Sequence, residues 1–219
     1  MAIFFYVFTP KKRIIAGRNN LGGNVMKIAV YGKLRAGKSA VCDYIANKYD
    51  CEILEFSGAV QEVVDVMYPE KKGVKDRETL VAVGQHMRKL DKDVWVNVIR
   101  NKIENSKAGH ILVAGVRQQN EYDMLKELGF TFIQVEASEN TRIERCIEAG
   151  DKFNKESLRN PTELVMDEWK PDYLILNEYG FKELEISIKN VLEDMDSKAL
   201  REAFFADGLK KFHERTKVK

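Results

Sequence analysis

The chain of 219 residues combines 44% hydrophobic with 32% charged residues, the balance of a globular protein large enough to bury one core. Its formal net charge of +2 gives no electrostatic reason to expect nucleic-acid binding. Its three cysteines lack CxxC or metal-ligand spacing, so we expect buried thiols, a reduced cytoplasmic setting, and neither a membrane nor a nucleic-acid partner.

The first 25 residues need an interpretation of their own. AIFFYVF, residues 2–8, is apolar but too short to span a bilayer, and it lacks the charge order and cleavage site of a signal peptide. It can form an extra edge strand in a weakly packed N-terminal extension. Alternatively, residues 21–25 can be encoded by a ribosome-binding sequence just before a start codon at Met26, which would make residues 1–25 a non-native leader. Both interpretations stay open.

Five short apolar runs after Met26 alternate with helix-length amphipathic stretches, which predicts βαβ units and a parallel sheet. The runs are KIAVYG (27–32), EILEF (52–56), HILVAG (110–115), FTFIQVE (130–136) and DYLILNE (172–178). The helical stretches are 39–49, 58–67, two helices within 75–107 that break near 90–93, then 118–128, 139–149, 181–195 and 197–216. An aspartate at the break can cap the second of those two helices. We predict one domain over residues 26–195, followed by a charged C-terminal helix at 196–219.

GKLRAGKS, residues 32–39, fits the phosphate-binding pattern G-x-x-x-x-G-K-[ST] and lies between a strand and a helix, as that pattern requires. Its glycines let backbone N–H groups curl around phosphate oxygens, while Lys38 reaches the β- and γ-phosphates and the Ser39 hydroxyl ligates magnesium. We therefore predict ATP and Mg²⁺ as cofactors. The predicted ATP-binding residues are Gly32, Lys33, Leu34, Arg35, Ala36, Gly37, Lys38, Ser39 and Ala40.

Arginines stand where a phosphate-handling site would need them. Arg117 directly follows the third strand, at the end where open α/β sheets bind ligands, and Arg77 and Arg88 lie between the second and third strands. Arg142 and Arg145 share one helix face, where an ion-paired, solvated surface is the plainer interpretation. Beside a phosphate-binding loop, however, arginine forks suit the donor and acceptor phosphates of a transfer reaction.

The ordered set of motifs resembles the nucleoside monophosphate kinase-like P-loop proteins. It is most similar to the deoxynucleoside monophosphate kinases and related AAA family ATPases of phages and Gram-positive bacteria, and more distantly to dephospho-coenzyme A kinase. The resemblance runs from about Met26 to Glu193. Its motifs are GKLRAGKS, GQHMRKLDKDVW, GVRQQNEYDMLKELGF, TRIERCIEAGD and the segment from NPTELVMDEW to NEYG.

This resemblance implies an α/β fold of the P-loop NTPase type, with three layers, a five-stranded parallel sheet of order 2-3-1-4-5 and a small helical lid at about 142–163. The catalytic residues that it implies are Lys38, Arg142 and Arg145. The acceptor-binding residues that it implies are Arg77, Arg88 and Arg117. Residues 177–180 would lie near the adenine of ATP. The expected partner is a small-molecule phosphate acceptor, and the expected assembly is a monomer or homodimer.

The chain departs from these relatives at Gly115, where they carry an aspartate at the end of the third strand, and at residues 56–61 after the second strand. Magnesium tolerates water in place of a carboxylate. Glu121 can supply an acid behind the metal's own ligands, or it can be an exposed acid favoured by a helix N-terminus. We expect transfer of the γ-phosphate of Mg-ATP to a (deoxy)nucleoside monophosphate. The alternatives are a kinase for another phosphorylated metabolite, such as dephospho-coenzyme A, and a non-catalytic ATP-binding regulator.

Overall fold

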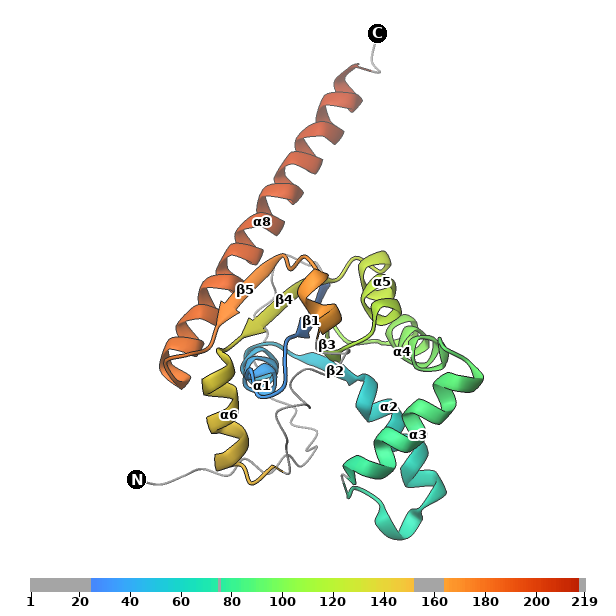
Figure 1. Cartoon of the computed structure of the whole chain (residues 1–219). Coiled ribbons are helices and arrows are strands. Elements are labelled where there is room, and N and C mark those ends of the chain that lie inside the picture. The colour runs from blue at the N-terminus through green and yellow to red at the C-terminus, as the bar shows by residue number, and fades with distance from the viewer. Residues whose placement is uncertain (1–24, 75, 152–163, 217–219) are drawn as a thin grey trace.

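One parallel sheet organises the chain. The computed structural model describes residues 25–74, 76–151 and 164–216, and within them five strands lie in the order β2-β3-β1-β4-β5 (Figure 1). The strands are β1 Met26–Tyr31, β2 Cys51–Glu55, β3 His110–Val116, β4 Thr131–Glu136 and β5 Tyr173–Leu176. Every pairing is parallel. The predicted fold class and strand order are thus confirmed, and each strand lies within two residues of its predicted bounds.

The helices follow the predicted alternation. They are α1 Lys38–Lys48, α2 Phe56–Met67, α3 Arg77–Leu90, α4 Val94–Asn105, α5 Gln119–Glu127, α6 Glu139–Glu148 and α8 Phe181–Thr216, with short 3-10 turns η1 Pro69–Lys71 and η3 Val165–Glu168. The predicted break between α3 and α4 is confirmed. An aspartate does stand at the N-cap of α4, as predicted, but Asp93 makes no side-chain capping bond to the helix. Its Oδ1 instead accepts a hydrogen bond from Asn120 Nδ2.

Two apolar cores, one on each face of the sheet, make the three layers. Alternate residues of β1 point to opposite faces. Ile28 and Val30 pack with α1 and α8, whereas Ala29 and Tyr31 pack with α2, α4 and α5. The hairpin of α2 and α3 projects from the end of β2, away from the body of the sheet (Figure 1). The carboxyl ends of the strands, where ligands bind in such sheets, therefore lie between this hairpin and α6.

The C-terminal part of the chain forms one helix where the sequence predicted two. α8 runs without a break from Phe181 to Thr216, and its first turns bury Leu184, Ile188 and Leu192 against the sheet. No glycine or proline interrupts residues 192–199, so nothing stops the helix near Asp196. Beyond the sheet the helix extends away from the other elements (Figure 1).

The end of β3 contains a β-bulge. β1 pairs Val30 with Ala114 but Tyr31 with Val116, so Gly115 is the extra residue between them. Gly115 has a φ of 74°, in the left-handed region that glycine adopts without a steric penalty. The glycine therefore has a backbone reason to stand at this position, which the sequence interpretation had described only as a missing acid.

Two predicted features lie outside the described residues. They are the N-terminal segment 1–24 and most of the predicted lid, residues 152–163. Within the described ranges, no helix has both the length and the apolar character needed to cross a membrane.

Candidate active site

The loop between β1 and α1 is packed too tightly at two positions for any side chain. Gly32 has a φ of 145° and Gly37 a φ of 106°. A Cβ on Gly32 would lie 2.2 Å from the carbonyl oxygen of Val135, and one on Gly37 would lie 2.1 Å from Nδ2 of Asn177. The loop is therefore held between β4 and the segment after β5, and only glycine fits at either end of it.

The inside of this loop is an anion site. α1 begins at Lys38, and its first turn has neither an acidic residue nor a side-chain cap, so its N–H groups and its dipole favour a negative ligand. Lys38 Nζ donates to the carbonyl oxygens of Gly32 at 2.7 Å and Lys33 at 2.8 Å, which holds the ammonium group at the loop. These groups fit the phosphates of ATP, and the Ser39 hydroxyl in the same turn fits the magnesium that accompanies them.

Two carboxylates near the loop were overlooked in the sequence. Asp43 follows Ser39 by one turn of α1, and Glu55 ends β2 opposite Ala114 of β3. Burial raises the pKa of Asp43, and the negative charge of Glu55 raises it further, so the two groups are close enough to interact. The four-residue spacing from Ser39 was the signal that could have identified Asp43. Within the described residues no group of three or more histidine, cysteine, aspartate or glutamate side chains could hold a metal ion.

The outer side of the loop is tied to α6 and to the segment after β5. Asn177 is 6% exposed and donates from Nδ2 to the carbonyl oxygen of Ala36 at 2.8 Å. Arg145 donates to the carbonyl oxygen of Arg35 at 3.2 Å and to that of Asn177 at 2.9 Å. In this conformation Arg145 supports the backbone of the cradle from outside. Its predicted contact with the transferred phosphoryl group stays a prediction, as does the proximity of residues 177–180 to adenine.

Two basic side chains of the loop form ion pairs with acids on either side of residues 152–163. Arg35 makes a bidentate pair with Asp151, with Nε–Oδ2 at 2.7 Å and Nη2–Oδ1 at 2.5 Å. Lys33 Nζ lies 2.8 Å from Asp167. Arg35 is also a non-glycine residue with positive φ, 60°, a conformation that costs an L-residue roughly 1 kcal/mol. The side chains of the loop therefore connect the cradle to Asp151, within the predicted lid, and to Asp167, just after it.

Arg142 is a buried cation on α6. It is 5% exposed, and its Nε and Nη1 have no hydrogen-bond partner among the described residues. A buried guanidinium with unpaired N–H groups is costly unless an anion meets it. The one-turn neighbour Cys146 is fully buried beside it. This arrangement is compatible with the predicted role of Arg142 toward a phosphoryl group, which stays a prediction.

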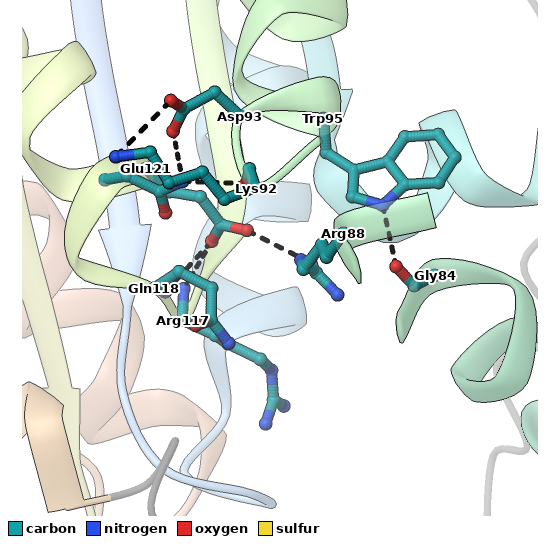
Figure 2. A network of polar contacts seen from close by, with 9 residues as sticks. Gly84, Arg88, Lys92, Asp93, Trp95, Arg117, Gln118 and Glu121 are labelled. Carbon is teal, nitrogen blue, oxygen red and sulfur yellow. Dashed lines mark hydrogen bonds and ion pairs between the residues drawn. The ribbon is translucent and has the colours of Figure 1, made fainter. Parts of the chain in front are cut away.

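Two of the arginines predicted to bind an acceptor, Arg88 and Arg117, contact one buried glutamate (Figure 2). Glu121, on α5, is 2% exposed and lies 3.3 Å from Nη2 of Arg88, which comes from α3. Its other oxygen accepts the backbone N–H of Arg117 at 2.8 Å and that of Gln118 at 3.1 Å. Figure 2 shows the guanidinium groups of Arg88 and Arg117 extending to the same side of Glu121. The structure thus brings together two of the three predicted acceptor residues.

The position of Glu121 corrects one sequence interpretation in part. Glu121 does lie in the first turn of α5, but it is buried, not exposed, and its carboxylate is paired with Arg88 and with the capping box of the helix. The other interpretation, an acid behind the ligands of a metal, stays a prediction. Burial raises the pKa of Glu121, although the two backbone N–H groups and the charge of Arg88 work in the opposite direction. The third predicted acceptor residue, Arg77, is the first residue of α3, and its side chain lies outside the described part of the structure.

Neighbouring contacts fix the elements that carry this network. Asn120 donates from Nδ2 to the carbonyl oxygen of Lys92 at 3.1 Å and to Oδ1 of Asp93 at 2.8 Å, which joins α5 to the corner between α3 and α4. Trp95 is 2% exposed and donates from Nε1 to the carbonyl oxygen of Gly84 at 3.1 Å, which joins α4 to α3 (Figure 2). Arg88 is thus held on a helix that is anchored from two sides.

The cysteines offer no covalent chemistry. Cys42 and Cys146 are buried and Cys51 is half-buried, and all three are free. Burial raises the pKa of Cys42 and of Cys146, and that of Cys51 to about 12, so none of the thiols is a ready nucleophile at neutral pH.

Comparisons with known proteins match this architecture. An AAA domain family model matches residues 28–167. No curated protein sequence matches the chain. Among solved structures, a shikimate kinase from Acinetobacter baumannii in complex with shikimate aligns with a TM-score of 0.52 and 14% identity, over 80% of this chain and 96% of that one. A gluconokinase from Sinorhizobium meliloti 1021 aligns with a TM-score of 0.51 and 18% identity, over 79% and 97%. The structure of TT1252 from Thermus thermophilus aligns with a TM-score of 0.50 and 17% identity, over 78% and 98%. At these identities the likeness is one of fold.

Proposed function

The chain belongs to the AAA domain family, and from this premise we propose that it is an ATP-dependent phosphotransferase that moves the γ-phosphate of Mg-ATP to a (deoxy)nucleoside monophosphate. The donor side of the site supports this proposal. The cradle of residues 32–39 presents the N-terminus of α1 and the Lys38 ammonium group to an anion. Buried Arg142 adds a second positive group on α6. Phosphoryl transfer depends on positioned positive charge of this kind.

The observation that carries the proposal is the second cationic centre. The Arg88 side chain and the Arg117 backbone N–H both contact Glu121 just past the carboxyl end of β3, next to the strand that leads into the cradle. A protein that only binds ATP has no use for arginines at a separate place along the sheet edge. A transferase needs them, because they can hold the anionic group of an acceptor in line with the γ-phosphate.

The groups around β3 support a phosphate acceptor in the proposal. During transfer the bond between the γ-phosphorus and the leaving oxygen of ADP breaks, and a bond from the acceptor oxygen to phosphorus forms. The phosphate oxygen of a nucleoside monophosphate is already negatively charged, so it loses no proton and needs no base. Gly115, one residue before the end of β3, has no side chain, and the Glu121 carboxylate is occupied by three donors, so neither position offers a base. This arrangement favours a phosphate acceptor.

Glu55 favours a second candidate. It stands at the carboxyl end of β2, where its Oε2 accepts a hydrogen bond from the Ser57 hydroxyl at 3.3 Å. A carboxylate at the end of a strand in such a sheet can take the proton of a hydroxyl acceptor. Dephospho-coenzyme A is an acceptor of that class. Loss of transfer to a hydroxyl acceptor in Glu55→Gln, with transfer to monophosphates unchanged, would favour this candidate.

The decisive experiment measures ADP formation by the full chain with Mg-ATP and a panel of acceptors. The panel contains nucleoside and deoxynucleoside monophosphates, dephospho-coenzyme A, and the hydroxyl acceptors shikimate and gluconate. Lys38→Ala is the matched negative control, since it removes the cradle cation, and protein without acceptor gives the background hydrolysis. Acceptor-dependent ADP with a monophosphate supports the proposal. Tight Mg-ATP binding without ADP formation for any acceptor would favour the non-catalytic regulator instead.

A further inference from the structure

Glu121 divides its two carboxylate oxygens between two tasks. Oε2 accepts the backbone N–H groups of Arg117 and Gln118, which caps α5 and fixes the turn after β3. Oε1 faces Arg88 Nη2 of another helix at 3.3 Å. One oxygen is enough for the cap, so the second oxygen and the negative charge serve the arginine. The same carboxylate thereby touches the side chain of one acceptor arginine and the main chain of the other.

We propose that Glu121 is a positioning residue that sets Arg88 and Arg117 as a pair to receive the phosphate group of the acceptor. This inference rests on the proposed function and goes beyond it, because it assigns a role to a residue that contacts neither ATP nor the transferred group. Arg88 on its own has a long, rotatable side chain that samples many directions. A buried carboxylate beneath it selects one of them and leaves the remaining N–H groups of the fork for a ligand.

A purely structural role explains less of the geometry. α5 is already anchored to the corner between α3 and α4 by Asn120, which bonds to Lys92 and Asp93. α3 is anchored independently through the bond from Trp95 to Gly84. Burying the Glu121 carboxylate is unfavourable in itself, so a group needed only for a helix cap would be served as well by a neutral or exposed residue. A helix cap alone does not need a charged partner. The pairing of the buried carboxylate with Arg88 is therefore explained by a role that depends on its negative charge.

Two substitutions separate the cap from the positioning role. Glu121→Gln keeps one carbonyl oxygen for the backbone N–H groups and turns its NH₂ group toward Arg88, which removes the attraction. Glu121→Asp keeps the charge and can still cap the helix, but it is one methylene shorter and withdraws from Arg88. Glu127→Gln is the matched control, because Glu127 lies on the same helix and pairs with Arg100 at the exposed surface, with Nη2–Oε2 at 2.6 Å.

The full chain and these variants are compared by calorimetric titration with deoxynucleoside monophosphates in the presence of saturating Mg-ADP, and by the KM for ATP and for the acceptor. We expect Glu121→Gln and Glu121→Asp each to weaken monophosphate binding about tenfold or more, since a hydrogen bond to a charged group is disturbed. The KM for ATP of the Glu121 variants should stay within about twofold of the wild-type value. Glu127→Gln should match the wild type both in monophosphate binding and in the KM for ATP.

The outcomes are distinguishable. Unchanged monophosphate binding in both Glu121 variants would overturn the inference, and so would an equal loss of ATP and acceptor binding, which would indicate a merely structural residue. Failure of the wild type to bind any monophosphate would overturn it as well. If the wild type binds a monophosphate, the Glu121 variants bind it more weakly, and no ADP is formed, then the positioning role holds while the proposed transfer fails.

Discussion

A side chain introduced at position 115 tests the interpretation of the bulge at the end of β3. Gly115 has a φ of 74°, and no described atom lies within 4 Å of a Cβ at this position, so substitution costs backbone strain without a clash. An L-residue in the left-handed region costs about 1 kcal/mol, and asparagine and aspartate tolerate it better than others. We therefore expect Gly115→Asn and Gly115→Asp to lower the free energy of unfolding by up to about 1 kcal/mol each, and Gly115→Val by about 2 kcal/mol or more.

Urea denaturation with an unchanged m-value measures this cost. The pair of Asn and Asp variants then isolates the charge, because the two side chains have the same shape. If a carboxylate at the end of β3 can reach the metal that accompanies ATP, Gly115→Asp should need less magnesium for half-maximal ADP formation than Gly115→Asn. If the free energy of unfolding of Gly115→Asn falls by more than about 3 kcal/mol, the conclusion that the space around Gly115 is open would be refuted. Identical magnesium dependence of both variants would show that this position does not stand in place of a metal ligand.

The other predictions concern four positions. Lys38→Ala should abolish ADP formation and change the free energy of unfolding by less than about 1 kcal/mol, because the ammonium group serves the ligand. If urea denaturation shows a fall in the free energy of unfolding as large as that of a core deletion, this assignment is contradicted. Arg35→Gly should be about 1 kcal/mol more stable than Arg35→Ala, since both lose the Asp151 pair and only glycine relieves the positive φ; equal urea midpoints would argue against strain there. Because the pKa of Glu121 is raised in the folded protein, the protonated group adds stability at acidic pH, and this stability is lost as pH rises through the native pKa. The difference in the free energy of unfolding between the wild type and Glu121→Gln should therefore shrink with rising pH. A difference that grows with pH would show that the pKa of Glu121 is lowered instead of raised. Gly84→Ala should raise the free energy of unfolding by about 0.5–1 kcal/mol, because a Cβ in this helix interior would meet Arg88 Nη1 and Val60 at ordinary contact distances of 3.6 Å; a lower thermal midpoint would indicate that this space is needed.

Much of the fold could be predicted because its signals are local. Short apolar runs separated by amphipathic stretches predicted all five strands, and GKLRAGKS placed the cradle between the first strand and the first helix. The order of the strands came from the family resemblance and agrees with the structure. The prediction of two C-terminal helices was wrong, because no glycine or proline near Asp196 breaks the helix and α8 runs through.

The sequence predicted which residues belong to the site better than it predicted which partners their side chains contact. Arg88 and Arg117 were selected by their place relative to the strands, and the structure does bring them together. The acids that bind the cradle, Asp151 and Asp167, were not anticipated, because each lies more than a hundred residues from its basic partner and no spacing rule connects them. An aspartate at the N-cap of α4 was predicted on local grounds and Asp93 stands there, but its carboxylate bonds to Asn120 of another helix and not to the helix it begins.

The sequence by itself determined the phosphate cradle and the α/β alternation, since backbone curvature at glycine and side-chain periodicity depend on residues a few positions apart. Only the tertiary structure decided what Gly115 and Glu121 do. Gly115 proved to be the extra residue of a bulge between β3 and β1, where the left-handed backbone itself requires glycine. Glu121 proved to be a buried partner of Arg88, which lies 33 residues away on another helix. Such roles arise when packing brings distant segments together and excludes water, and those two conditions fix the partner and the pKa of a charged group.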